Sequence, residues 1–199
     1  MSRATPATAK EPGTASVRDR ILDTAADLFY QEGVRAVGVD LVVERSGVAK
    51  TSLYRHFTTK DELVAAVLER DDANYWAAWD KIATRHRNAP GDEIKAHLQW
   101  IARDIATPKY RGCPFLNVAT EFPAPDHPAR VVALRHKTEL RRRLGALVKQ
   151  IGRARPDSLA SQIALLIDGA YVSRKLAKGA AQPLLPAALA LISAADNPG

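Results

Sequence analysis

The segment GVAKTSLYRHFTTKDEL, residues 47–63, concentrates amine, guanidinium, hydroxyl, phenol and imidazole groups on little more than one short helix. Such groups hydrogen-bond to phosphate oxygens and to base edges, and a phenol ring can also pack against a thymine methyl group. A core helix would not carry so many polar side chains, so we expect an outside partner, and DNA fits their chemistry. The candidate DNA-binding residues are Lys50, Thr51, Ser52, Tyr54, Arg55, His56 and Lys60.

Three short helices are expected to position this segment. Apolar residues recur at helical spacing over 16–33, and further short helices are expected over 39–46 and 49–57. Leu53 and Phe57 stand four residues apart, so they share one face of the third helix and leave its polar residues outside. Two short helices joined by a tight turn have helix-turn-helix geometry, in which the second helix enters the major groove. The alternative is a three-helix element whose polar face meets only solvent.

The run AADLFYQEGVRAVGVDLVVERSGVAKTSLYRHFTTKDELVAAVL resembles the N-terminal DNA-binding domain of the TetR family of bacterial regulators, over about residues 18–68. The resemblance implies an all-helical homodimer that binds a palindromic operator. It also implies release from DNA when a small molecule enters the larger C-terminal domain. The positions that carry the resemblance are Phe29, Gly33, Val39, Gly47-Val48, Leu53-Tyr54, His56-Phe57 and Lys60-x-x-Leu63.

The resemblance also implies roles for single residues. Ser52, Tyr54 and His56 match DNA-contact positions of the family, and Lys60 matches a phosphate-contacting lysine. The two residues before Ser52 match variable positions that help to set sequence preference. One position departs from the pattern, because Gly38 replaces the Ser or Thr that commonly caps the second helix and touches a phosphate. That contact is therefore not expected here.

The rest of the chain is helical by pattern as well. A capping box over residues 59–62 begins a long fourth helix. Breaks at Pro and Gly separate further helices, expected near 92–106, 114–121, 128–153, 157–178 and 184–195. The fold class is therefore all-α with about nine helices. The expected division is a disordered tail at 1–15, a helix-turn-helix DNA-binding domain at 16–59, and a larger effector-binding and dimerisation domain at 60–199.

The C-terminal part carries aromatic residues with a few polar residues among them. A mostly apolar cavity with a few convergent polar groups is typical of a small-molecule site, although a single aromatic residue is more often part of a core. The set favours a hydrophobic or aromatic effector. The candidate effector-binding residues are Trp76, Trp79, Trp100, Tyr110, Cys113, Phe115, Asn117, Glu121, Phe122, His136, Asp168 and Tyr171.

Cys113 is the only cysteine, which excludes an internal disulfide and fits a reducing compartment. It precedes Pro114 at an expected helix start and follows Lys109 and Arg111, surroundings that favour a reactive thiol. Thiol oxidation is therefore an alternative signal. The simpler interpretation is a small residue packed at a helix start, since no second cysteine exists to resolve an oxidised thiol.

By position, the last two helices resemble the pair through which the family dimerises. Two copies on a palindrome need half-sites about 34 Å apart, which also favours a dimer. The expected dimerisation residues are Ile163, Ile167, Ala170, Leu185, Leu189 and Ile192. The alternative is that these residues bury only the core of their own chain.

The net charge of +7 is unevenly distributed, because residues 128–155 carry nine Lys or Arg against Glu139 alone. A solvated helix face is the usual outcome, and contact with DNA phosphate or an acidic effector is the other hypothesis. The N-terminus lacks the apolar run of a signal peptide, and later apolar stretches are too short to span a bilayer. No enzyme motif or metal-ligand spacing appears. We expect a cytoplasmic protein that is not an enzyme and needs no metal, cofactor or membrane.

Together these features predict a sequence-specific DNA-binding transcriptional regulator, a repressor released from a palindromic operator by a small-molecule effector. The expected partners are double-stranded operator DNA, a second copy of the chain and that effector. The alternative is a helix-turn-helix regulator without a small-molecule ligand, controlled by abundance, thiol oxidation or a protein partner. Ligand-dependent loss of operator affinity separates the two.

Overall fold

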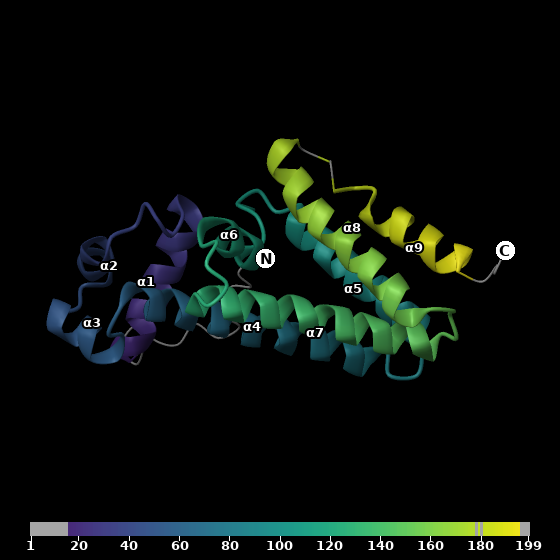
Figure 1. Ribbon diagram of the computed structural model, residues 1–199, viewed down its shortest axis with the longest axis horizontal. Helices are drawn as coiled ribbons and strands as arrows, with labels where there is room; N and C mark the ends of the chain where they lie inside the picture. Colours follow the sequence, from purple (N-terminus) through teal and green to yellow (C-terminus); the bar gives the residue numbers. More distant parts are fainter. Residues whose placement is uncertain (1–15, 178, 180, 196–199) are drawn as a thin grey trace. The chain divides into compact units, whose positions relative to one another are not determined.

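The computed structural model describes residues 16–177, 179 and 181–195, which form nine α-helices and no strand (Figure 1). The predicted all-α fold class is confirmed. The tail expected at 1–15 lies outside the described residues. The helices are α1 (Val17–Glu32), α2 (Val39–Ser46), α3 (Lys50–His56), α4 (Lys60–Arg85), α5 (Pro90–Ile105), α6 (Pro114–Glu121), α7 (Pro128–Gln150), α8 (Pro156–Leu176) and α9 (Leu184–Ala194).

The chain packs as two compact units, and each is assembled from two separate stretches of sequence. The head unit contains the described residues of 3–73 together with 114–135, and the body unit contains 74–113 together with the described residues of 136–199. Helices α4 and α7 each run through both units. The first turns of α4 and all of α6 therefore pack with the helix-turn-helix elements. The expected boundary between functional domains stays a prediction.

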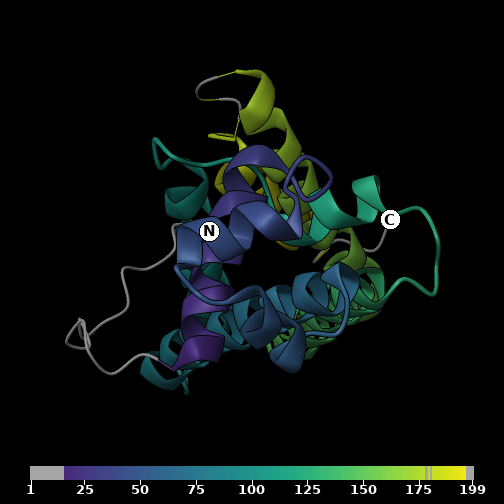
Figure 2. The same ribbon diagram turned by 90° about the vertical axis from the view of Figure 1, so that its left-hand side faces the viewer.

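In the head unit, α1, α2 and α3 are short helices set at different angles to one another (Figures 1 and 2). Ser16 caps α1, because its Oγ accepts a hydrogen bond at 3.1 Å from the backbone N–H three residues later. Gly33 ends α1 with a φ of +89°, and Gly47 makes the turn between α2 and α3 with a φ of +64°. Leu53 and Phe57 are buried, as their spacing predicts.

The predicted capping box at the start of α4 is present in altered form. Thr59 Oγ1 accepts the backbone N–H of Glu62 at 3.1 Å, as expected. The Glu62 carboxylate accepts the backbone N–H of Thr58 at 2.8 Å, one residue before the partner of a standard box. The start of α4 is therefore fixed on both sides, which also fixes the chain that leaves α3.

The body unit combines the later part of α4 and most of α7 with α5, α8 and α9. Helix α9 packs against both α5 and α8, which also contact each other (Figure 1). Leu98, Ile101, Leu140, Leu144 and Ile163 are almost fully buried between these helices. Among the described residues, none of the helices has both the length and the apolar character needed to cross a membrane.

Candidate functional site

Helix α3 presents the predicted DNA-binding residues on its outer surface. Five of them, Lys50, Thr51, Tyr54, Arg55 and His56, are exposed, and the Tyr54 side chain is 44% accessible. Ser52 and Lys60 are half-buried, Lys60 as the first residue of α4. The structure thus brings the seven residues together around one short helix whose inner side lies on the core of the head unit. Donors, acceptors and a phenol ring remain available to a nucleic acid.

A long-range bridge from α1 holds the turn before α3. The guanidinium group of Arg20 donates from Nη2 to the carbonyl oxygens of Ser46 at 2.7 Å and Gly47 at 3.0 Å. Carbonyl oxygens at the end of a helix have no partner within the helix, and a cation satisfies them well. The sequence analysis missed Arg20, because no local pattern links it to Ser46 and Gly47, which lie 26 and 27 positions later in the chain.

The starts of α2 and α3 lack side-chain caps. Gly38 and Ala49 occupy the two N-cap positions, and neither offers a side-chain hydrogen bond. Lys50, the first residue of α3, instead contacts Asp40 in the first turn of α2, with 2.7 Å between Nζ and Oδ1. The hydrogen bond to Asp40 raises the pKa of Lys50. The sequence analysis did not link Asp40 to Lys50.

Helix α6 is tied to the loop between α1 and α2 within the head unit. The two carboxylate oxygens of Glu121 accept the backbone N–H groups of Val34 at 3.3 Å and Arg35 at 2.9 Å. The next residue, Phe122, stacks on His127 with ring centroids 4.0 Å apart and lies 5.8 Å below the Arg35 guanidinium carbon. Two orphan backbone donors and an exposed cation thus find partners on a segment distant in sequence.

Four predicted effector-binding residues belong to the head unit, and the rest of that set belong to the body unit. Phe115 is buried, and Asn117, Glu121 and Phe122 are half-buried. Asn117 and Glu121 line a cavity between α1, α4 and α6 that also touches Phe29. Its volume of about 30 Å³ is far below the roughly 300–1,000 Å³ of typical small-molecule sites. In this conformation the cavity is small for an aromatic effector.

The body unit gathers the three candidate tryptophans and His136 into one cluster. Tyr75 lies at its centre, with ring centroids 4.9 Å from Trp76, 4.9 Å from Trp100 and 4.7 Å from His136. The Tyr75 hydroxyl is buried, and burial raises its pKa. The Trp79 ring is tilted relative to Tyr75, with centroids 6.3 Å apart, and stacks on His97 instead. The sequence analysis named the tryptophans and overlooked Tyr75, which directly precedes Trp76.

A second group of candidates lies on and around α8. Tyr110 donates its hydroxyl proton to the backbone carbonyl of Tyr171 at 3.2 Å. Asp168 pairs with Lys137, a partner that the sequence analysis did not name, and the Lys137 ammonium lies 5.2 Å from the centre of the Tyr171 ring. Cys113 is buried at 4% accessibility, whereas redox-sensing thiols are solvent-accessible. The structure thus gives the thiol-oxidation alternative no support.

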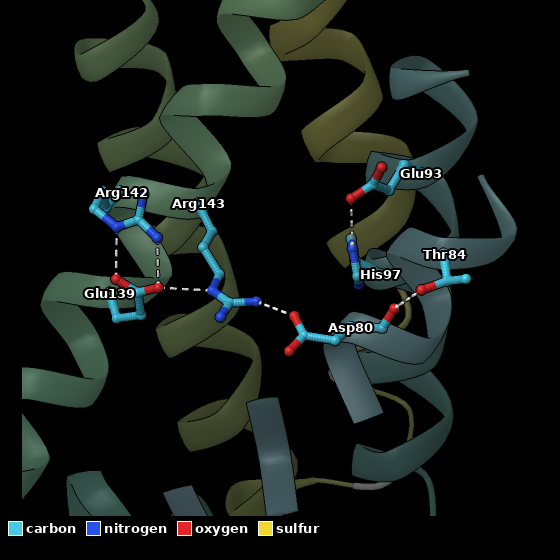
Figure 3. A network of polar contacts seen from close by, with 7 residues as sticks. All are labelled: Asp80, Thr84, Glu93, His97, Glu139, Arg142 and Arg143. Atoms are coloured by element: carbon cyan, nitrogen blue, oxygen red, sulfur yellow. Dashed lines mark hydrogen bonds and ion pairs between the residues drawn. The ribbon is translucent and has the colours of Figure 1, made fainter. Parts of the chain in front are cut away.

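Several cations of the basic run on α7 pair with acidic groups of their own unit, as Figure 3 shows. Arg142 contacts Glu139 at 2.6 Å, and Arg143 bridges Glu139 at 2.7 Å and Asp80 on α4. The hydrogen bond from Arg142 is the main reason that the pKa of Glu139 falls to about 2. Within the head unit, Arg135 lies near two further carboxylates of α4. Much of the charge excess is therefore engaged inside the chain, which weakens the hypothesis of an anionic effector.

His97 on α5 is buried beside Trp79 and Glu93. Its ring stacks on Trp79 with centroids 3.5 Å apart. Its Nε2 lies 3.4 Å from Glu93 Oε1, a contact drawn in Figure 3. Burial lowers the pKa of His97 to about 3 and raises the pKa of Glu93. Both shifts favour uncharged side chains. The pair therefore behaves as packed core.

Most of the residues expected at a dimer interface are buried in the single chain. Ile163, Ile167, Ala170 and Ile192 are at most 8% accessible, and only Leu185 and Leu189 are half-buried. The burial of the first four residues within one chain favours the alternative of a core role, and their part in a dimer interface stays a prediction. The exposed apolar residues of α8 are Leu165, Val172 and Leu176, which recur every seven or four positions and so share one face.

A sequence model of the family described as "Bacterial regulatory proteins, tetR family" matches residues 21–67. The HTH-type transcriptional repressor Rv3405c of Mycobacterium tuberculosis is 32% identical over 148 residues, which are 70% of this chain and 73% of that protein. This similarity therefore extends well beyond the helix-turn-helix segment.

Two solved structures resemble the chain over nearly its whole length. The TetR-family transcriptional regulator SCO4454 of Streptomyces coelicolor superposes with a TM-score of 0.86 at 28% identity, covering 91% of this chain and 96% of that one. The putative TetR transcriptional regulator sav143 of Streptomyces avermitilis has a TM-score of 0.83 at 32% identity, covering 92% and 99%. The fold of both units is therefore shared with these regulators.

The Glu121 carboxylate makes the first prediction. Replacing Glu121 by Ala leaves two backbone N–H groups of the α1–α2 loop without their acceptor, so we expect the free energy of unfolding to fall by about 1–3 kcal/mol. Urea denaturation followed by circular dichroism measures the change. The control is Thr120→Ala, a change at the neighbouring exposed residue. The Thr120 hydroxyl donates to the carbonyl oxygen of Leu116 within α6. Equal losses in the two variants would contradict a specific role for Glu121.

The buried His97 predicts a pH dependence of stability. Its folded pKa of about 3 lies below the ordinary 6.5, so the unfolded chain binds the proton more readily and stability falls as the pH drops from 6.5 towards 3. Between pH 7 and pH 5 we expect this residue to cost about 2 kcal/mol. His97→Phe keeps a ring against Trp79 and should remove that part of the pH dependence, measured by urea denaturation at both pH values. His56→Gln, an exposed control, should retain it, and a pH dependence that His97→Phe leaves unchanged would refute the assignment.

Proposed function

Because the chain belongs to the TetR family of helix-turn-helix transcriptional regulators, we propose that it is a repressor that binds a palindromic operator as a homodimer and is released by a small molecule. Its relatives are regulators of transcription, and the chain is a DNA-binding regulator, not an enzyme. The observation that carries the proposal is the exposed polar face of α3, fixed by the buried Leu53 and by the Arg20 bridge. A repressor role is favoured by the similarity to a protein named as a repressor. A regulator that acts on DNA in this way is expected to be a cytoplasmic protein.

In the proposed complex, α3 lies in the major groove and α2 crosses the phosphate backbone. Tyr54 and Arg55 are exposed on α3 and supply a phenol and a guanidinium group, which suit thymine methyl and guanine contacts. Lys60, at the start of α4, suits a phosphate, because helix-end N–H groups add to its positive charge. Contacts to base edges select a sequence, and contacts to phosphates fix the register of the protein on the duplex.

The proposed dimer is formed by the exposed apolar face of α8. Leu165 is 72% and Leu176 83% accessible, with Val172 between them. Large apolar side chains exposed in one row mark interaction surfaces. Leu185 and Leu189 on α9 remain partly accessible and are kept as interface candidates. A symmetric pairing of α8 would link two head units, as a palindrome requires.

The proposed effector site is the aromatic cluster of the body unit. Its rings pack directly on one another, so an effector has to displace some of them, and Trp76 and Trp100 are the half-exposed members. The buried hydroxyl of Tyr75 is a polar group within this otherwise apolar cluster. A hydrophobic or aromatic compound matches these surroundings. The residues of α6 that were expected in this site are not part of the proposal.

The proposal is tested by selecting genomic fragments on the purified protein at physiological salt, where non-specific phosphate binding is weak. We expect a few palindromic fragments, and we expect a panel of hydrophobic and aromatic compounds to include one that releases them. No enrichment over bulk DNA would overturn sequence-specific binding. Enrichment that no compound of the panel reverses would favour the regulator without a small-molecule ligand.

The α8 face predicts the effect of a single charge. Leu165→Asp places a carboxylate on the proposed interface. We expect the dissociation constant of the dimer to rise at least about 100-fold, because a buried unpaired charge costs several kcal/mol. Analytical ultracentrifugation at micromolar concentration measures it. Ala146→Asp adds the same charge at an exposed position of α7 and should leave the dimer intact. A Leu165→Asp protein that sediments as a dimer would remove α8 from the interface.

A further inference from the structure

The ion pair between Asp40 and Lys50 lies on the outer surface of the helix-turn-helix. Its two side chains are 80% and 56% accessible, and Nζ and Oδ1 are 2.7 Å apart. Asp40 belongs to the helix that crosses the phosphate backbone in this motif, and Lys50 begins the helix that enters the groove. The pair therefore joins a carboxylate and an ammonium group at the place where phosphates and base edges are both within reach.

Helix α3 begins with charges that do not suit a helix start. Its N-cap is Ala49, which provides no side-chain hydrogen bond, and its first turn has no acidic residue. Lys50 places a cation at the positive end of the helix dipole, where an anion is favoured. Asp40 supplies the missing negative charge from α2. The carboxylate thus both stabilises the start of α3 and holds the lysine ammonium beside it.

We propose that Asp40 is a positioning residue that sets the sequence preference of Lys50, by keeping its ammonium group from phosphates and directing it to a guanine. The inference rests on the proposed DNA contact of α3. A phosphate near the pair meets a carboxylate as well as an ammonium group, so most of the attraction is cancelled. The ammonium group has three donors, of which Asp40 occupies one. The other two match the O6 and N7 acceptors of guanine in the major groove.

The test replaces Asp40 by Asn, which keeps the shape and removes the charge. Released from its partner, Lys50 should bind phosphate, so we expect a non-specific duplex to be bound about five- to tenfold more tightly at 0.1 M salt, with the slope of log K against log salt steeper by about 0.9. In a selection from random sequences, the preference for guanine at one position of each half-site should weaken. If Asp40 only stabilised the fold, its replacement would not weaken the base preference at one single position of the half-site.

Two further variants separate the possible outcomes. Glu44→Gln removes the same charge from an exposed position of the same helix and should leave the guanine preference unchanged. Lys50→Ala should abolish that preference, and adding Asp40→Asn to it should change it no further. If Asp40→Asn and Glu44→Gln behave alike, or if the preference survives Asp40→Asn, the inference is overturned while DNA binding stands. If the unaltered protein selects no sequence, the proposed function and this inference both fail.

Discussion

The backbone conformation of the turn between α2 and α3 is the constraint on which the outer surface of α3 depends. Gly47 adopts a φ of +64°, and a Cβ atom there would lie 3.4 Å from Arg20 Nη2. This left-handed backbone conformation favours glycine, and the two hydrogen bonds of the Arg20 guanidinium hold the carbonyl groups that close α2. Burial of Leu53 fixes the rotation of α3 about its own axis. Together these contacts decide which side chains face outward.

Local sequence signals were sufficient for the helices of the head unit. Ser16 caps α1 through its hydroxyl, and Gly33 and Gly47 end their helices with a positive φ. The predicted bounds of α1, α2 and α3 agree with the structure within one or two residues. The exposed set on α3 also followed from spacing, because Leu53 and Phe57 alone determine the inner side of so short a helix. Caps, turns and periodicity act within a few residues, and such signals can be seen in a single sequence.

Contacts between distant parts of the chain could not be predicted in this way. Glu121 bonds to backbone groups 86 and 87 residues earlier, and backbone N–H groups carry no sequence signature. Helix α8 is apolar on more than one side, so periodicity could not tell Ile163, which is buried, from Leu165, which is exposed. The basic run of α7 looked like a free surface because Asp80, its partner, lies on another helix. The roles assigned to the DNA-binding residues stay predictions.

The divided head unit limits how regulators of this kind can be recombined. Its two stretches, 16–73 and 114–135, are separated in sequence by forty residues of the body unit (74–113). A chimera joined at the end of α3 would take its α6 from the other parent. The two N–H groups of the α1–α2 loop would then keep an acceptor only if that parent also carried a carboxylate at the position of Glu121. For this chain, an exchange of α1 to α3 with a parent that lacks this carboxylate should therefore include α6, a segment that does not touch DNA in the proposed complex.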